Sequence, residues 1–380
     1  MAVLPCPTLI VRALIPFVRL TSLMLRITAT LWILTMTDCL PFLLATPADD
    51  YACGRYRVRD PFTALFNAGL VDGVVFPYFL DDDTFLDLAP DVLVVQRVLE
   101  HDQIAVLERY RRLGSARIVF DLDDLLTITP RDNKCTRRFH DDVAARLYRA
   151  MSLCDRLVFS TDYLASHFSH GDKVVCQNSL PDSPWANLRL SRRLFVKPRV
   201  GWAGSAGHLG DLKLLYKVVP ALSDVVDWVF MGQIPQVIAR HCAEVHPLVP
   251  IDQYPQRLAD LGLDLAVAPL QSHPYNDAKS HLRLLELGAC GYPVICSDVQ
   301  AFDVPLPVHR CSDDPSDWIE AVRGAIADRD ALSAWGDRMR ADVLAHWLLS
   351  GRVGHWFDAW FNPFNECNSR LAPSALINYL

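Results

Sequence analysis

A lysine and a glutamate stand seven residues apart in NDAKSHLRLLELGACGYPVICSD, the segment from residue 276 to 298. The segment follows the apolar run LDLAVAPL, and its pattern predicts a helix that begins near Lys279 and Ser280. Free N–H groups at the start of a helix attract anions, and Lys279 adds a positive charge there. Glu286 then lies on nearly the same helix face, roughly 10 Å along the axis. This spacing fits a ligand with a diphosphate at one end and a ribose at the other, whereas the alternative is an exposed pair on a solvated face.

Glycine recurs every three residues in the stretch GWAGSAGHLG, at positions 201, 204, 207 and 210. This spacing is neither the dinucleotide-binding motif nor a P-loop. A strand that ends in a turn of small residues and leads into a helix is still able to hold a phosphate. Ser205 and His208 could donate hydrogen bonds to such a group. The alternative is a tight turn that requires glycine for backbone reasons alone.

Three carboxylates end a predicted strand, at Asp121, Asp123 and Asp124. A D-x-D pair can chelate Mg²⁺ or Mn²⁺, as in GT-A glycosyltransferases. The stretch also resembles the first motif of haloacid-dehalogenase-like phosphatases, with Asp121 as nucleophile and Asp123 as acid/base, although Leu125 departs from that pattern. A third interpretation places the carboxylates beside an acceptor, and a fourth has Asp123 and Asp124 cap the next segment.

The composition is that of a globular protein with two domains. The chain has 380 residues, of which 51% are hydrophobic and 21% are charged, and its net charge is −7. A negative balance gives no reason to expect a nucleic acid partner. The eleven cysteines occur singly without a C-x-x-C pair, which argues against a zinc ribbon or a redox motif. Free thiols are typical of a reducing compartment, so we expect a cytoplasmic protein.

Residues 1–38 differ from the rest of the chain. They contain no acidic residue before position 38 and carry arginines at positions 12, 19 and 26. A spacing of seven residues puts these arginines on one helical face. The longest uncharged stretch in this segment has eleven residues, which is too short to span a membrane. The segment predicts a basic amphipathic helix in peripheral contact with a membrane, or a targeting peptide, outside the fold. We expect translation to begin at Met36.

Short apolar segments alternate with amphipathic ones along the rest of the chain. This alternation predicts an α/β protein with two doubly wound, Rossmann-like domains that face a cleft. Ligands of such sheets bind at the carboxyl ends of the strands. We expect a first domain at 39–185, a linker at 186–198, a second domain at 199–335 and C-terminal helices at 336–380 that pack back across both domains.

Four blocks between residues 200 and 298 carry a family resemblance. They are VGWAGSAGHLGDL, FMGQIP, YPQRLADLGLDLAVAPL and the segment quoted first. Together they resemble the nucleotide-sugar-binding domain of GT-B glycosyltransferases, most closely the group-1-like family of bacterial cell-surface and polysaccharide enzymes. The first half resembles that family more loosely, in YACGRYRVRDPFTAL, VVQR and VFDLDD. Glu286 matches the second of a pair of donor-binding glutamates, which meets the ribose, whereas Ala278 stands at the position of the first.

The resemblance implies a retaining, metal-independent glycosyltransferase. It would move a hexose from a UDP- or GDP-linked sugar to a saccharide or lipid-linked acceptor, with no obligatory cofactor. The expected nucleotide-sugar site comprises Gly204, Ser205, His208, Gly232, Asn276, Lys279, Ser280 and Glu286. We expect Lys279, Glu286 and His101 to be the catalytic residues, and Asp121, Asp123 and Asp124 to lie on the acceptor side. The alternatives are the phosphatase described above and a catalytically silent nucleotide-sugar-binding module, to which Ala278 points.

Overall fold

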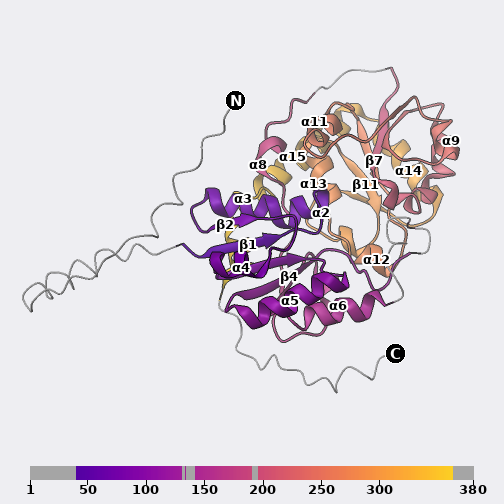
Figure 1. The fold of residues 1–380 in the computed structure, drawn as a ribbon. Helices are drawn as coiled ribbons and strands as arrows, with labels where there is room; N and C mark the ends of the chain where they lie inside the picture. Colours follow the sequence, from indigo (N-terminus) through magenta and orange to yellow (C-terminus); the bar gives the residue numbers. More distant parts are fainter. Residues whose placement is uncertain (1–39, 131–132, 134–141, 191–195, 363–380) are drawn as a thin grey trace, which may run out of the picture. The chain divides into compact units, whose positions relative to one another are not determined.

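The described part of the chain, residues 40–130, 133, 142–190 and 196–362 of a computed structural model, forms two six-stranded β-sheets (Figure 1). The strand order is β2-β1-β3-β4-β5-β6 in the first sheet and β12-β11-β10-β7-β8-β9 in the second. Every strand pair in both sheets is parallel. The predicted α/β class with two doubly wound sheets is therefore confirmed, and the predicted membrane-contacting segment at residues 1–38 lies outside the described residues.

The first sheet occupies the first half of the chain. Its strands are β1 (Phe42–Thr46), β2 (Asp72–Val75), β3 (Val92–Gln96), β4 (Arg117–Leu122), β5 (Arg156–Phe159) and β6 (Lys173–Val175). Its helices are α2 (Ala52–Gly54), α3 (Asp60–Asn67), α4 (Asp82–Leu88), α5 (His101–Leu113), α6 (Val143–Met151) and α7 (Asp162–Ser166). Strands β3 and β4 are buried on both faces, which is why their sequences are nearly continuous apolar runs.

A wide helical turn precedes α3 and differs from the prediction. The sequence predicts one helix over residues 56–70, whereas the chain becomes helical at Ala52 and passes through the π-helix η2 (Arg55–Arg59). Pro61 has no N–H with which to bond the carbonyl four residues before it. In the turn before it, the Asp60 N–H donates to the carbonyl of Arg55, one residue farther back than in an α-helix. This turn carries two buried side chains of the site described below.

The second sheet occupies the other half. Its strands are β7 (Arg199–Gly204), β8 (Asp227–Gly232), β9 (Glu244–His246), β10 (Leu265–Ala268), β11 (Val294–Ser297) and β12 (His309–Cys311). Its helices are α8 (Asp182–Trp185), α9 (Val218–Leu222), α10 (Gln236–Ala239), α11 (Tyr254–Ala259), α12 (Pro274–Asp277), α13 (Leu282–Ala289) and α14 (Pro315–Ile326), with the 3₁₀ turns η3 (Ala206–His208), η4 (Asp211–Leu215) and η5 (Gln300–Phe302). The sequence predicts a helix over 211–222 that is kinked or ended at Pro220, whereas the chain forms η4 and then α9. Pro220 lies in the first turn of α9, where a missing N–H is tolerated.

The last two helices pack on different sheets. Helix α15 (Arg329–His346) lies against α13, where a Cβ on Gly288 would come within 2.7 Å of Val343 Cγ2. Helix α16 (Val353–Phe361) instead inserts Trp356 and Trp360 into the core of the first sheet. Between the two helices, the carbonyl of Trp347 accepts a hydrogen bond from the N–H of Leu180. The C-terminal helices therefore contact the cores of both halves.

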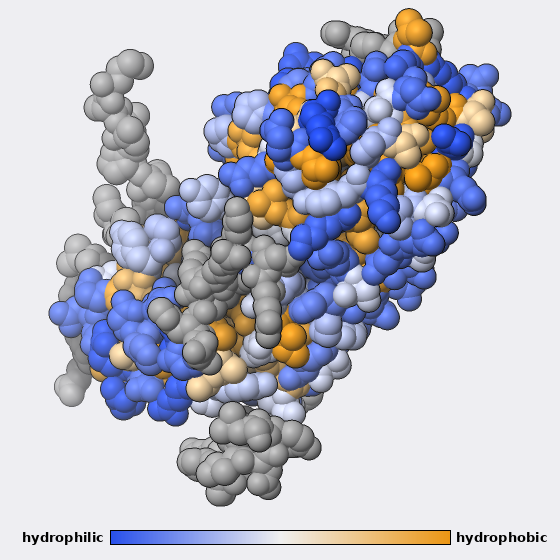
Figure 2. Space-filling view, turned by 90° about the vertical axis from the view of Figure 1, so that its right-hand side faces the viewer, coloured by the Kyte–Doolittle hydropathy of each residue, from blue (hydrophilic) through white to orange (hydrophobic). Residues whose placement is uncertain are grey.

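The surface is mixed in character. Figure 2 shows a face on which hydrophobic side chains are scattered among hydrophilic ones. Among the described residues, no helix combines the length and the apolar character needed to cross a membrane.

Candidate functional site

Lys279 connects the two halves of the molecule. It lies in the loop between α12 and α13, and its amine donates a hydrogen bond of 3.1 Å to Asp124, which follows β4 of the first sheet. The amine also lies 4.4 Å from the centre of the Tyr275 ring. Burial lowers the pKa of Lys279, but the charge of Asp124 outweighs this effect and the net pKa is raised. The Lys279 side chain is therefore charged. It is 19% exposed.

The helix that follows begins later than predicted. Helix α13 starts at Leu282 with His281 as its N-cap, so Lys279 and Ser280 lie in the preceding loop rather than in the first turn. Ser280 accepts a hydrogen bond of 2.8 Å from Asn178 of the first half. Thr161 of the first half donates a hydrogen bond to the carbonyl of Ala278, so the loop is fixed on both sides of the lysine.

Glu286 is buried in α13 and has two tyrosine partners. Its carboxylate accepts hydrogen bonds from the hydroxyls of Tyr56, at 3.0 Å, and Tyr254, at 3.3 Å. Burial raises its pKa, while the charge of Arg283 opposes that shift. Only 8% of the Glu286 side chain is exposed. The interpretation of Lys279 and Glu286 as an exposed pair on a solvated face is therefore wrong. Tyr56 comes from the wide turn η2, so this contact also joins the two halves.

Arg283 is a second cation that sequence reasoning missed. Its guanidinium donates to the carbonyl of Ala203 at the end of β7, and it lies 3.3 Å from Nε2 of His208 and 4.0 Å from Glu286. It stands three residues before Glu286, a spacing that places both on one face of α13, and four residues after Lys279 in the preceding loop. That spacing is a signal in the sequence, and it could have identified Arg283.

The glycines at the ends of β7 and β8 serve backbone packing. Gly204 and Gly232 are paired across the two strands. Gly232 has a φ of +114°, and a Cβ there would come within 1.9 Å of the Gly204 carbonyl oxygen. The backbone explanation therefore accounts for Gly232, whereas a Cβ on Gly204 would come within 2.4 Å of the Trp202 ring. Ser205, which follows Gly204, is exposed at this edge.

Asp211 organises the loops around the predicted phosphate-binding turn. One of its oxygens accepts from the Gln271 N–H, at 3.0 Å, and from the Asn276 amide, at 2.8 Å. The other lies 3.0 Å from Nδ1 of His208. Burial lowers the pKa of His208, against the opposing effect of Asp211. Asn276 and His208 are thus held by a buried aspartate that the sequence analysis did not single out.

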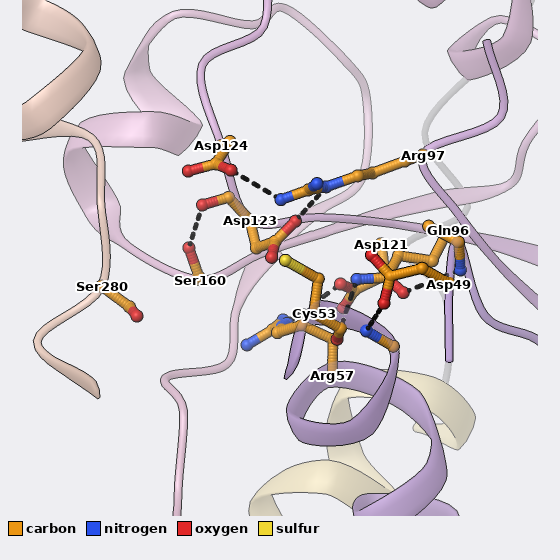
Figure 3. A network of polar contacts seen from close by, with 12 residues as sticks. Asp49, Cys53, Arg57, Gln96, Arg97, Asp121, Asp123, Asp124, Ser160 and Ser280 are labelled. Atoms are coloured by element: carbon orange, nitrogen blue, oxygen red, sulfur yellow. Dashed lines mark hydrogen bonds and ion pairs between the residues drawn. The ribbon is translucent and has the colours of Figure 1, made fainter. Parts of the chain in front are cut away.

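The three aspartates at the end of β4 and just after it are held by two arginines (Figure 3). Both carboxylate oxygens of Asp121 accept from the guanidinium of Arg57, at 2.9 and 2.7 Å, and neither side chain is exposed. Arg97 donates to Asp123 at 2.5 Å and to Asp124 at 2.6 Å. Its φ of +49° is unusual for a residue other than glycine. Because Asp121 is buried against Arg57, it is inaccessible to a substrate, and the structure argues against the phosphatase interpretation.

The catalytic role expected for His101 and the alternative of a metal site at the D-x-D pair have no support from the local contacts. His101 begins α5 with its side chain 80% exposed, and its nearest acidic partner is Asp142, at 3.6 Å. Among the described residues, its contacts include none with Lys279 or Glu286. In the same part of the chain, no group of three or more His, Cys, Asp or Glu residues is placed to hold a metal ion.

Acidification is expected to destabilise the protein through His281. This side chain is 1% exposed, and its ring packs edge-on against Trp347; burial and the charge of Arg352 lower its pKa to about 3. Below a pH of about 6.5 the unfolded chain takes up a proton that the folded chain does not, so stability falls as the pH drops from there toward 3. At pH 5 the expected loss is about 2 kcal/mol.

Urea denaturation at pH 7 and pH 5 measures this effect. We expect His281→Gln to lose less stability over this interval than the wild type. The control is His346→Gln, which changes an exposed histidine and should leave the pH dependence unaltered. An identical pH dependence in His281→Gln and the wild type would contradict the assignment.

Comparisons with known proteins bear on the fold. No protein-family model matches the sequence, and no curated protein matches it either. Among solved structures, Anabaena HepE in complex with UDP and glucose matches with a TM-score of 0.59 and 12% identity, over 84% of this chain and 100% of that chain. The Arabidopsis thaliana starch synthase IV catalytic domain, bound to ADP and acarbose, has a TM-score of 0.57 and 12% identity, over 84% and 98% of the two chains. TarM matches with a TM-score of 0.54 and 9% identity. The match covers 73% of this chain but only 57% of the length of TarM.

These likenesses, together with the two parallel sheets, define the fold class. The chain has the GT-B fold that the sequence resemblance implied. At such low identities the match concerns architecture, so the activity has to be argued from the side chains.

Proposed function

We propose that the protein is a glycosyltransferase that moves a sugar from a nucleoside-diphosphate sugar to a saccharide or lipid-linked acceptor. The observation that carries this proposal is the grouping of Lys279, Arg283 and Glu286 after β10, beside the ends of β7 and β4. Two cations, one in the loop before α13 and one in its first turn, match a diphosphate, and a buried carboxylate beyond them matches the hydroxyls of a ribose. The complexes of HepE with UDP-glucose and of starch synthase IV with ADP support this choice.

The chemistry follows from where charge develops. The bond between the sugar and the diphosphate breaks, so the leaving diphosphate gains negative charge, while the acceptor hydroxyl forms the new bond and loses its proton. Lys279 and Arg283 would stabilise that charge from fixed positions in a partly buried site. Glu286 would hold the ribose and set the position of the donor. We further propose that the configuration of the sugar is retained and that these two cations take the place of a metal ion.

The proposal is tested with nucleotides and nucleotide sugars. We expect UDP or GDP to bind, and at about 100 times the dissociation constant to stabilise the protein by about 2.7 kcal/mol. We also expect the matching nucleotide sugar to be consumed in the presence of a saccharide acceptor. Binding without turnover would favour the silent binding module instead. Absence of binding by every nucleoside diphosphate at millimolar concentration would overturn the proposal.

A further inference from the structure

Two of the side chains expected to hold the donor already have partners from the first half. Lys279 is bonded to Asp124, and Glu286 is bonded to Tyr56. We propose that Asp124 stands in for the donor diphosphate in the ligand-free protein, so that the first half of the chain competes with the donor for Lys279. This inference rests on the proposed function, because it assumes that Lys279 meets the diphosphate.

The chemistry of the contact supports a stand-in. A carboxylate and a phosphate present the same kind of anionic oxygen to an ammonium group, and both form short charge-assisted hydrogen bonds. The Asp124 oxygen lies 3.1 Å from the Lys279 amine, in a contact that is largely shielded from water, with side-chain exposures of 16% and 19%. A diphosphate that approached Lys279 would therefore meet a carboxylate already in place, with a charge of the same sign.

A phosphate can replace Asp124 at Lys279 because each of the two side chains has another partner. Asp124 keeps Arg97 as a partner, at 2.6 Å, when it leaves Lys279. Lys279 keeps the ring of Tyr275, at 4.4 Å. Replacement of Asp124 by a phosphate therefore leaves no buried charge without a partner, which is the main cost of breaking a buried ion pair. Arg57 and Asp121 show the opposite arrangement, because Asp121 has no second cation at hydrogen-bonding distance among the described residues.

The exchange requires only a side-chain movement. The loop that carries Lys279 remains attached to the first half, because Thr161 donates a hydrogen bond of 3.0 Å to the carbonyl of Ala278. Tyr275 and Ala278 are also buried in the core of the first sheet. Rotation of the Asp124 carboxylate toward Arg97 would free the amine without separating the two halves.

Neighbouring carboxylates offer a matched test. Asp123 and Asp124 lie in the same loop and share Arg97, but only Asp124 is bonded to Lys279. We expect Asp124→Asn to bind UDP or GDP about tenfold more tightly than the wild type, as measured by calorimetry, because the competing charge is removed. We expect Asp123→Asn to bind the same nucleotide within about twofold of the wild type, since it leaves the Lys279 contact in place. Uridine and guanosine, which have no phosphate, should not distinguish Asp124→Asn from the wild type.

The outcomes separate this inference from the proposed function. If the wild type binds a nucleoside diphosphate and neither Asp124→Asn nor Asp124→Ser binds it more tightly, the stand-in is refuted while the glycosyltransferase proposal survives. Asp124→Ser provides a second variant in case the asparagine protein does not fold. If neither the wild type nor any variant binds a nucleoside diphosphate, both proposals fail.

Discussion

Replacement of Arg57 by methionine is expected to lower the free energy of unfolding by about 3–5 kcal/mol. Both oxygens of Asp121 depend on this guanidinium, and burial already raises the pKa of Asp121 against the opposing charge of Arg57. Without the arginine, the buried carboxylate must either stay charged without a hydrogen-bonded partner or take up a proton. Arg57 also donates to the carbonyl of Cys176, at 2.6 Å, and packs 4.7 Å from the centre of the Trp356 ring. Its loss therefore weakens contacts among η2, β4, β6 and α16.

Urea denaturation of a matched pair of variants tests this prediction. Arg59 lies two residues away in the same turn and pairs with Asp50 at the surface. Arg59→Met should therefore cost no more than about 1 kcal/mol. The double variant Arg57→Met/Asp121→Asn should recover part of the loss, since it removes the unpaired charge. A loss in Arg57→Met as small as that in Arg59→Met would show that the buried pair contributes little.

Replacement of Lys279 by alanine is expected to reduce turnover of the nucleotide sugar by about 100- to 1,000-fold, the usual effect of removing one group that stabilises developing charge. The fold should persist, because Asp124 retains Arg97 when the lysine is lost. The control is Lys217→Ala, which removes an exposed lysine just before α9. Initial rates with the donor identified by the binding panel measure the effect.

A lysine that contributes only to folding would give a different pattern. In that case, the surviving folded protein would keep its turnover number while its unfolding midpoint fell. Normal turnover in Lys279→Ala would show that this lysine does not act on the leaving diphosphate, and Arg283 would then be the remaining cation for that role.

The two-sheet fold could be predicted because its signals are local. Each strand is a short apolar run, and the alternation of such runs with amphipathic segments specifies a doubly wound sheet. The exact ends of the helices and strands were harder to predict from the sequence. At the start of α13 and in the wide turn before Pro61, Ser280 and Tyr56 bond to residues of the other half of the chain, and a local pattern does not show such contacts.

The site was predicted in part, because its contacts join distant residues. Lys279, Ser280 and Glu286 all follow β10, but only Glu286 lies on α13, so the shared helix face that their spacing suggested is not formed. Tyr56, which contacts Glu286 across 230 positions of sequence, carries no local signal of that role. His101 follows β3 closely in the sequence, but it begins α5 with an exposed side chain, which a local pattern does not reveal.

The path of the last helix restricts how this molecule can be divided. A fragment cut at the predicted linker would carry the whole first sheet but would lack α16, whose Trp356 and Trp360 fill its core. Removal of these two buried indoles would leave an open apolar groove on the first sheet. Such exposed apolar surface promotes aggregation. A chimera that borrows the first sheet must therefore include residues 353–361, although they follow the second sheet in the sequence.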